Sequence, residues 1–179
     1  YQMEVIFHIL CHLLYNEQKR MDIPMNQAEK LALQQTLIDS PKKLAQLIAP
    51  ISAEQRTTQY IDGEWSIAQN VHHCADVAVL FYARLKRILT EDNPTLMGLA
   101  QDEWAMLPEA NSADTDNAFA LMQSIQQSVA TLVPSLTEEQ LARTGFHARY
   151  EVSMTAESVI NKFNLHITMH LAQIQDQID

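Results

Sequence analysis

The chain contains 179 residues, of which 47% are hydrophobic and only three are glycine, and its formal net charge at pH 7 is -10. This charge would repel nucleic-acid phosphates and anionic membrane surfaces, so neither is an expected partner. The length fits one domain, and aromatic and β-branched residues form no alternating runs, which favours an all-α protein.

The first residues are predicted to be an extension of the domain. The apolar segment from Val5 to Tyr15 is shorter than the roughly 20 residues of a membrane helix, and no Lys or Arg precedes it as in a secretory signal. The two cysteines, Cys11 and Cys74, form no CxxC pair and no disulfide framework, which favours a reducing, cytoplasmic location. We therefore divide the chain into an extension, residues 1–21, and a folded domain, residues 22–179.

Four long helices are predicted, and the first two have recognisable ends. The first covers about residues 26–49, and Pro41 should kink or restart it. Its apolar positions are Leu31, Leu37, Leu44, Leu47 and Ile48. The second begins after Ser66, whose hydroxyl and the side chain of Gln69 fit a capping box, and it continues to about Thr90.

The third helix is predicted over about residues 113–133. Asp114 and Asp116 suit its N-terminus, and Pro134 ends it. A short helical turn, residues 137–143, follows. The long connections between the helices are expected to carry function or local structure. They cover residues 51–65, 91–112 and 134–152.

The fourth helix starts near Ser153 or Thr155, runs almost to the C-terminus and contains His166 and His170. Their spacing of four places both imidazoles on one helical face, a chelating arrangement that also occurs by chance on helix surfaces. The two histidines share a stripe with apolar residues, Val159, Phe163 and Ile174, so they should point inward. Two buried imidazoles without partners would cost roughly 1–3 kcal/mol each, whereas a metal ion satisfies both, so we favour metal ligands over ordinary core histidines.

A third ligand is expected from the adjacent residues His72 and His73 on the second helix. Only one of them can face inward. His73 is in register with Val77 and Leu80, whereas His72 lies about 100 degrees away around the helix. Periodicity alone leaves both residues as alternatives.

Three neutral imidazoles suit zinc, nickel, copper or iron and leave at least one coordination position open, which favours catalysis. A closed structural zinc site would need a fourth ligand, and Cys74 points away from the direction of His73. His8 and His12, although four residues apart, have no evident third ligand and are predicted to be surface or packing residues. His147, before the last helix, is predicted to be solvated or hydrogen-bonded, with a position at the mouth of the metal site as the alternative.

The stretch from Gly63 to Asp76, GEWSIAQNVHHCAD, resembles the signature of the DinB-like superfamily, and specifically of its YfiT-type metal-dependent hydrolases. The resemblance covers most of the chain after Met21. It continues through Arg84 to Lys86, Leu89 to Glu91, Pro94 to Trp104, Phe146, His147, Thr155, Glu157, His166, His170 and Ile174.

This resemblance implies a four-helix bundle with long crossover loops and a metal triad of His73, His166 and His170. It further implies one divalent metal ion per subunit, zinc or nickel, and a cytoplasmic homodimer. The chain departs from the family pattern at Leu165 and Met169, which changes the pocket lining. It also has Ala100 and Gln101 where some relatives carry an acidic pair.

The first functional hypothesis is a metal-dependent hydrolase acting on a small molecule, in which Asp76 or Glu157 could orient a ligand imidazole. The second is a metal-dependent thiol S-transferase, for which Arg149 and Lys162 are the nearest cations to receive an anionic cofactor. The third is a non-catalytic metal-binding module. The sequence names no general acid or base.

Overall fold

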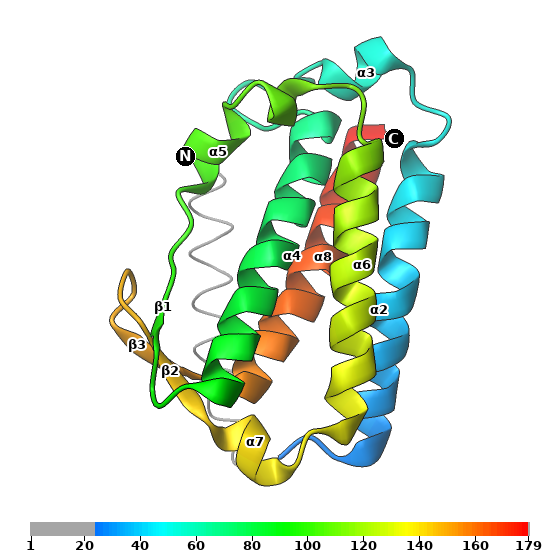
Figure 1. Ribbon diagram of the computed structural model, residues 1–179. Coiled ribbons are helices and arrows are strands. Elements are labelled where there is room, and N and C mark those ends of the chain that lie inside the picture. Colours follow the sequence, from blue (N-terminus) through cyan, green and yellow to red (C-terminus); the bar gives the residue numbers. More distant parts are fainter. Residues whose placement is uncertain (1–23, 179) are drawn as a thin grey trace.

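The computed structural model describes residues 24–178, in which four long helices lie side by side (Figure 1). These helices are α2 (Gln27–Ile48), α4 (Ile67–Thr90), α6 (Asp116–Leu132) and α8 (Ala156–Ile178). Both α2 and α4 pack against α6 and against α8, so each helix has two neighbours around one core. The predicted four-helix bundle is confirmed.

The start of α4 follows the predicted chemistry, whereas α2 departs from its prediction at two positions. At the start of α4, the Gln69 backbone N–H donates to Ser66 Oγ at 3.3 Å, and the Ser66 N–H donates to Gln69 Oε1 at 3.0 Å. Helix α2 passes through Pro41 without restarting, contrary to one of the two predicted outcomes. Leu31, one of the apolar positions of the predicted helix, is not part of the core. Its side chain is 49% exposed, whereas that of Leu37 is 1% exposed.

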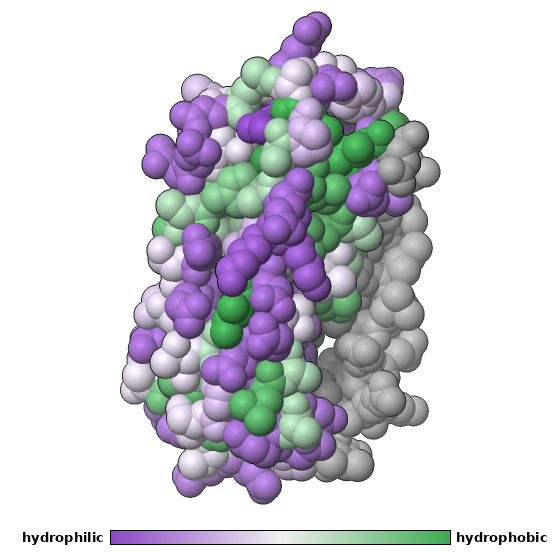
Figure 2. All heavy atoms as spheres, turned by 90° about the vertical axis from the view of Figure 1, so that its right-hand side faces the viewer, coloured by the Kyte–Doolittle hydropathy of each residue, from purple (hydrophilic) through white to green (hydrophobic). Residues whose placement is uncertain are grey.

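The outer surface of the bundle is polar where α2 faces solvent. Figure 2 shows hydrophilic residues interspersed with smaller apolar patches on the side that lies at the right of Figure 1. Exposed polar residues of α2 are Gln35, Lys42, Lys43 and Gln46. This arrangement is typical of helices that bury one face and solvate the other.

The long connections contain short elements, as predicted, but their strands were not predicted. The elements are α3 (Ala53–Thr57), β1 (Thr95–Leu96), α5 (Gln101–Ala105), η2 (Glu109–Asn111), η3 (Val133–Ser135), α7 (Glu138–Ala142), β2 (Thr144–His147) and β3 (Val152–Thr155). Strand β1 pairs with β2 in parallel, and β2 pairs with β3 in antiparallel. Strands of two to four residues are too short to show a period of two in the sequence.

The small sheet places alternate residues of β2 against α4. Gly145 and His147 are buried, whereas Thr144 and Phe146 are exposed. An ideal Cβ added to Gly145 would lie 2.8 Å from Leu96 Cδ2 and 3.0 Å from the carbonyl oxygen of Pro94. An added methyl group would force the buried Leu96 side chain to shift, and the Pro94 carbonyl oxygen, a backbone atom, could give little room.

Gly145→Ala is therefore expected to lower the free energy of unfolding by about 1–3 kcal/mol, the usual cost of overpacking. The matched control is Gly98→Ala, where the nearest atoms to an added Cβ lie 3.7 and 3.8 Å away on Arg149. The control should change stability by less than about 0.5 kcal/mol. Urea unfolding followed by circular dichroism compares the two variants, and equal midpoints would contradict this account of Gly145.

Within residues 24–178, no helix combines the length and the apolar character needed to cross a membrane. The predicted extension, residues 1–21, lies outside the described residues. The same holds for Cys11 and for the predicted surface histidines, His8 and His12. Cys74 lies on α4 and is fully buried.

Candidate metal centre

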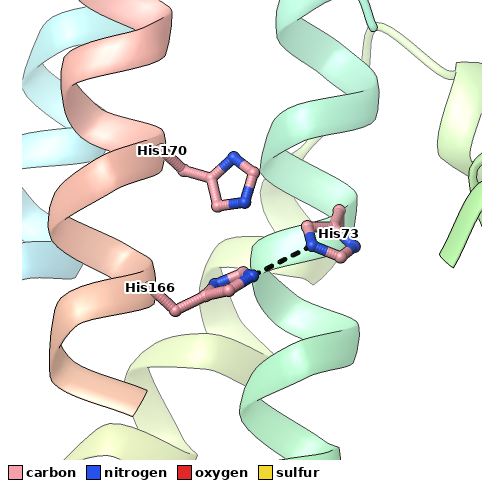
Figure 3. Close-up of side chains that lie close together, drawn as sticks. All are labelled: His73, His166 and His170. Carbon is pink, nitrogen blue, oxygen red and sulfur yellow. Dashed lines mark hydrogen bonds between the residues drawn. The ribbon is translucent and has the colours of Figure 1, made fainter. Parts of the chain in front are cut away.

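The three predicted histidines converge between α4 and α8 (Figure 3). His73 projects from α4, and His166 and His170 project from α8, so that one nitrogen of each ring lies within 4.8 Å of the others. The Nε2 atoms of His73 and His166 are 3.1 Å apart. Among the histidine, cysteine and carboxylate side chains of residues 24–178, these three histidines are the ones whose geometry could hold a metal ion.

The packing of α4 on α8 distinguishes His73 from His72. His73 is buried together with Val77 and Leu80, as its helical register predicts. His72 instead lies with its Nε2 3.2 Å from the carbonyl oxygen of Ser112. The ring that joins the pair on α8 is therefore that of His73.

Burial makes all three rings neutral at pH 7. Loss of hydration lowers the pKa of His73 and of His166 well below the usual value, and the neighbouring imidazoles lower it further. Burial also lowers the pKa of His170, to about 4. Because each neutral imidazole keeps one nitrogen lone pair, the cluster can offer three donors to a cation without first losing protons.

Aromatic rings border the cluster, and the sequence did not identify them as part of the site. The rings of Trp65 and His73 meet edge to face with centroids 4.7 Å apart. The Phe81 ring lies 6.3 Å from that of His166 and stacks on Phe163 at 5.5 Å. These apolar walls limit the access of water and so strengthen electrostatic interactions at the centre.

The observed geometry fits a transition-metal ion. Two imidazole nitrogens bound about 2.0–2.1 Å from a tetrahedral zinc lie about 3.3 Å apart, close to the separation of the His73 and His166 Nε2 atoms. Among the described residues, Cys74 does not belong to the histidine cluster. Burial raises the pKa of its thiol, which keeps the thiol protonated. Three imidazoles without a thiolate suit an ion of intermediate softness, such as zinc or nickel.

The residue that contacts the ring of His170 is Asn70, whereas the sequence suggested Asp76 or Glu157 as the partner of a ligand imidazole. Asn70 Oδ1 lies 2.9 Å from His170 Nδ1. Glu157 instead accepts a hydrogen bond from the backbone N–H of Met25 at 3.1 Å. Burial raises the pKa of the Asp76 carboxyl group, and its interaction with His72 partly opposes this rise.

His147 has the predicted hydrogen-bonding role and not the solvated one. Its side chain is 1% exposed, and its ring stacks on Tyr150 with centroids 4.5 Å apart. Arg84 Nη2 donates to His147 Nε2 at 2.9 Å, and Arg84 Nε donates to the carbonyl oxygen of Met97 at 2.9 Å. Arg84 on α4 therefore binds both His147 of β2 and the residue that follows β1, outside the histidine cluster.

The same contacts predict a loss of stability in acid. Burial first, and the charge of Arg84 second, lower the pKa of His147 from 6.5 to about 4. Between these two values the unfolded chain binds more protons than the folded chain, so the free energy of unfolding falls as the pH falls from about 6.5 toward about 4.

His147→Gln keeps an acceptor for Arg84 but removes this titration. Urea unfolding at pH 7 and pH 5, with chelator present in both proteins, should show a smaller loss of stability for the variant than for the wild type. An equal loss would show that His147 does not titrate differently in the two states.

The two cations proposed for an anionic cofactor, Arg149 and Lys162, both lie close enough to His147 for their charges to lower its pKa. Arg149 Nη1 donates to the carbonyl oxygen of Leu99 at 2.5 Å. The structure thus places both cations beside the small sheet.

Comparisons with known proteins agree with the geometry. The family model of the DinB superfamily matches residues 36–174, a stretch that contains the three clustered histidines. The chain is 31% identical over 142 residues to "putative metal-dependent hydrolase YfiT" of Bacillus subtilis (strain 168), which covers 79% of this chain and 80% of the relative. It is also 31% identical over 133 residues to "putative metal-dependent hydrolase OB0413" of Oceanobacillus iheyensis, which covers 74% of this chain and 76% of the relative.

A solved structure shows the same architecture. YfiT from Bacillus subtilis, described as "a probable metal-dependent hydrolase with an unusual four-helix bundle topology", matches with a TM-score of 0.81 at 29% identity and covers 86% of this chain and 87% of that chain. The fold, the matched stretch and the shared identity lead to one conclusion: the chain belongs to the DinB superfamily.

Proposed function

We propose that the protein is a metal-dependent hydrolase of a small-molecule substrate and that His73, His166 and His170 bind one divalent ion, zinc or nickel, per subunit. The observation that carries this proposal is the convergence of three neutral ring nitrogens within 4.8 Å of one another. The relatives named as metal-dependent hydrolases support it. The cytoplasmic location and the homodimer implied by the resemblance remain predictions.

The number of protein ligands favours catalysis over a structural site. Within residues 24–178, the cluster has three members, whereas structural zinc is usually closed by four protein ligands. Three ligands leave room for a water or substrate atom. When bound, a divalent ion at such a site lowers the pKa of a coordinated water and polarises a carbonyl or phosphoryl oxygen.

The residues of the chain have separable roles in this proposal. His73, His166 and His170 hold the ion as neutral donors. Trp65 and Phe81 exclude bulk water from two of these rings, at centroid distances of 4.7 and 6.3 Å. The described residues of the cluster thus contribute binding and orientation at the centre.

A metal-dependent thiol S-transferase is the second candidate. Arg149 and Lys162, which both influence His147 electrostatically, could receive the anionic groups of a thiol cofactor. A metal-binding centre would then lower the pKa of the thiol and hold its thiolate as the nucleophile. A non-catalytic metal-binding module is the third.

Turnover measurements on the metal-loaded protein separate these functions. We would compare chromogenic carboxylic esters, amides and phosphate esters with mixtures of a small thiol and an electrophile. Hydrolysis that disappears in His73→Ala and persists in His72→Ala would support the proposal, because the two residues are adjacent but only His73 lies in the cluster. Turnover restricted to the thiol mixtures would favour the transferase, and a metal-loaded protein without turnover on any substrate would favour the module.

A further inference from the structure

The side chain of Asn70 connects the start of α4 to a ring of the histidine cluster on α8. It is fully buried, in the first turns of α4, and the residue it contacts lies 100 positions later in the chain. We propose that Asn70 is a positioning residue that fixes His170 in the tautomer with the proton on Nδ1, so that Nε2 is the nitrogen offered to a divalent metal ion. The part of this inference that concerns metal binding rests on the proposed function.

The orientation of the Asn70 amide is set by two backbone carbonyls. Its Nδ2 donates to the carbonyl oxygen of Trp65 at 3.3 Å and to that of Ser66 at 3.0 Å. Carbonyl oxygens only accept hydrogen bonds, so the group facing them must be the NH₂. The alternative assignment, with the amide reversed, would place an oxygen against both carbonyls. The oxygen Oδ1 is therefore the atom that faces His170.

This orientation dictates the proton position on His170. Asn70 Oδ1 lies 2.9 Å from His170 Nδ1, and an amide oxygen only accepts, so Nδ1 must carry the hydrogen. In a neutral imidazole the other nitrogen then keeps its lone pair. The hydrogen bond from Nδ1 thus determines that Nε2 is free to bind a cation.

The free nitrogen points in the required direction. Figure 3 shows one nitrogen of the His170 ring directed toward the other two imidazoles and the other directed away from them. The ring centroids of His73 and His166 lie 5.0 and 4.5 Å from that of His170. Rings that bind metals usually donate their second N–H to such an acceptor, which aligns the ring before the ion arrives.

The neighbouring ring on α8 lacks this support. His166 Nδ1 is buried without a hydrogen-bond partner among the described residues, and its Nε2 contacts His73 Nε2. Gln173 also forms a hydrogen bond with the His170 side chain, so its contribution needs its own variant. The Asn70 amide is held by the carbonyl oxygens of Trp65 and Ser66, which immediately precede α4.

The first test needs no variant and no metal. Nitrogen-15 NMR of histidine-labelled, chelator-treated protein at pH 7.5 distinguishes a protonated from an unprotonated ring nitrogen. We expect His170 to be protonated at Nδ1 and not at Nε2. A proton on Nε2, or an even mixture of the tautomers, would overturn the assignment whether or not the protein binds metal.

The second test measures metal affinity. Asn70→Leu removes the acceptor at similar volume and should weaken zinc binding by about 10–100-fold in competition with a chromogenic chelator, the usual effect of losing such a partner. The matched control is Gln126→Leu, which also removes a fully buried amide but one that accepts from Ser40 on α2 at 2.9 Å. Its zinc affinity should equal that of the wild type.

The outcomes separate this inference from the proposed function. A wild type that binds no zinc contradicts the proposed function, while the tautomer of His170 in the metal-free protein still decides the role of Asn70. A wild type that binds zinc, with equal affinity in Asn70→Leu, overturns the positioning role alone. Weakened binding in Gln173→Ala but not in Asn70→Leu would overturn it as well, because it would assign that role to Gln173.

Discussion

His166→Ala and His170→Ala are each expected to lower the metal content of the purified protein from about one transition-metal ion per subunit to nearly none. Each change leaves two of the three clustered donors, and two imidazoles hold a divalent ion far less tightly than three. The rings lie together between α4 and α8, and within residues 24–178 they form the group of side chains placed to hold a metal ion. Elemental analysis by mass spectrometry after dialysis measures the ratio directly.

The adjacent residues His72 and His73 provide the sharpest control for this prediction. His73→Ala should lose the metal as the α8 variants do. His72→Ala should keep it, because the ring of His72 contacts the carbonyl oxygen of Ser112. Circular dichroism verifies that each variant is folded. Unchanged metal content in His166→Ala or His170→Ala would contradict the proposed centre.

Removal of the metal by a chelator is expected to lower the melting temperature of the wild type substantially. A ligand that binds only the folded state adds about 4 kcal/mol of stability when its concentration is 1,000 times its Kd. For a chain of this length each 1 kcal/mol corresponds to about 2–4 °C, so the expected decrease is on the order of 8–16 °C. Differential scanning calorimetry with and without chelator measures the shift, and restored zinc should reverse it.

The histidine variants show whether this shift comes from the cluster. In His73→Ala, the melting temperature should be the same with and without chelator, because the variant has no ion to lose. In His72→Ala, the shift should match that of the wild type. Identical curves for the wild type under both conditions would contradict a buried metal centre, and an equal shift in His73→Ala would locate the metal elsewhere.

Much of the candidate site could be predicted because its determinants are local in the sequence. A spacing of four residues on a helix places His166 and His170 on one face whatever surrounds them. The capping box of Ser66 and Gln69 marks the start of α4 through hydrogen bonds between residues three apart. The apolar stripe around the two histidines predicted that they face the core, and His170 is indeed buried.

Features that depend on distant parts of the chain could not be predicted in the same way. The contact of Asn70 with His170 joins residues 100 positions apart, and no local pattern distinguishes Asn70 from any other polar residue near a helix start. Strand β1 pairs with β2 across about fifty residues, and each strand is too short to show alternation. Leu31 fits the apolar pattern of α2 but is exposed, because the neighbouring helices cover a different face.

The sequence by itself therefore determined the four helices, the capping box of α4 and the pair of histidines on α8, since each depends on hydrogen bonds or periodicity within a few residues. Periodicity left His72 and His73 as alternatives and only the family resemblance implied His73. The tertiary structure places His73 in the cluster, with Trp65, Phe81 and Asn70 around it. The physical reason is that adjacent residues on a helix differ by about 100 degrees in direction, and only the packing of α4 against α8 determines which direction is inward.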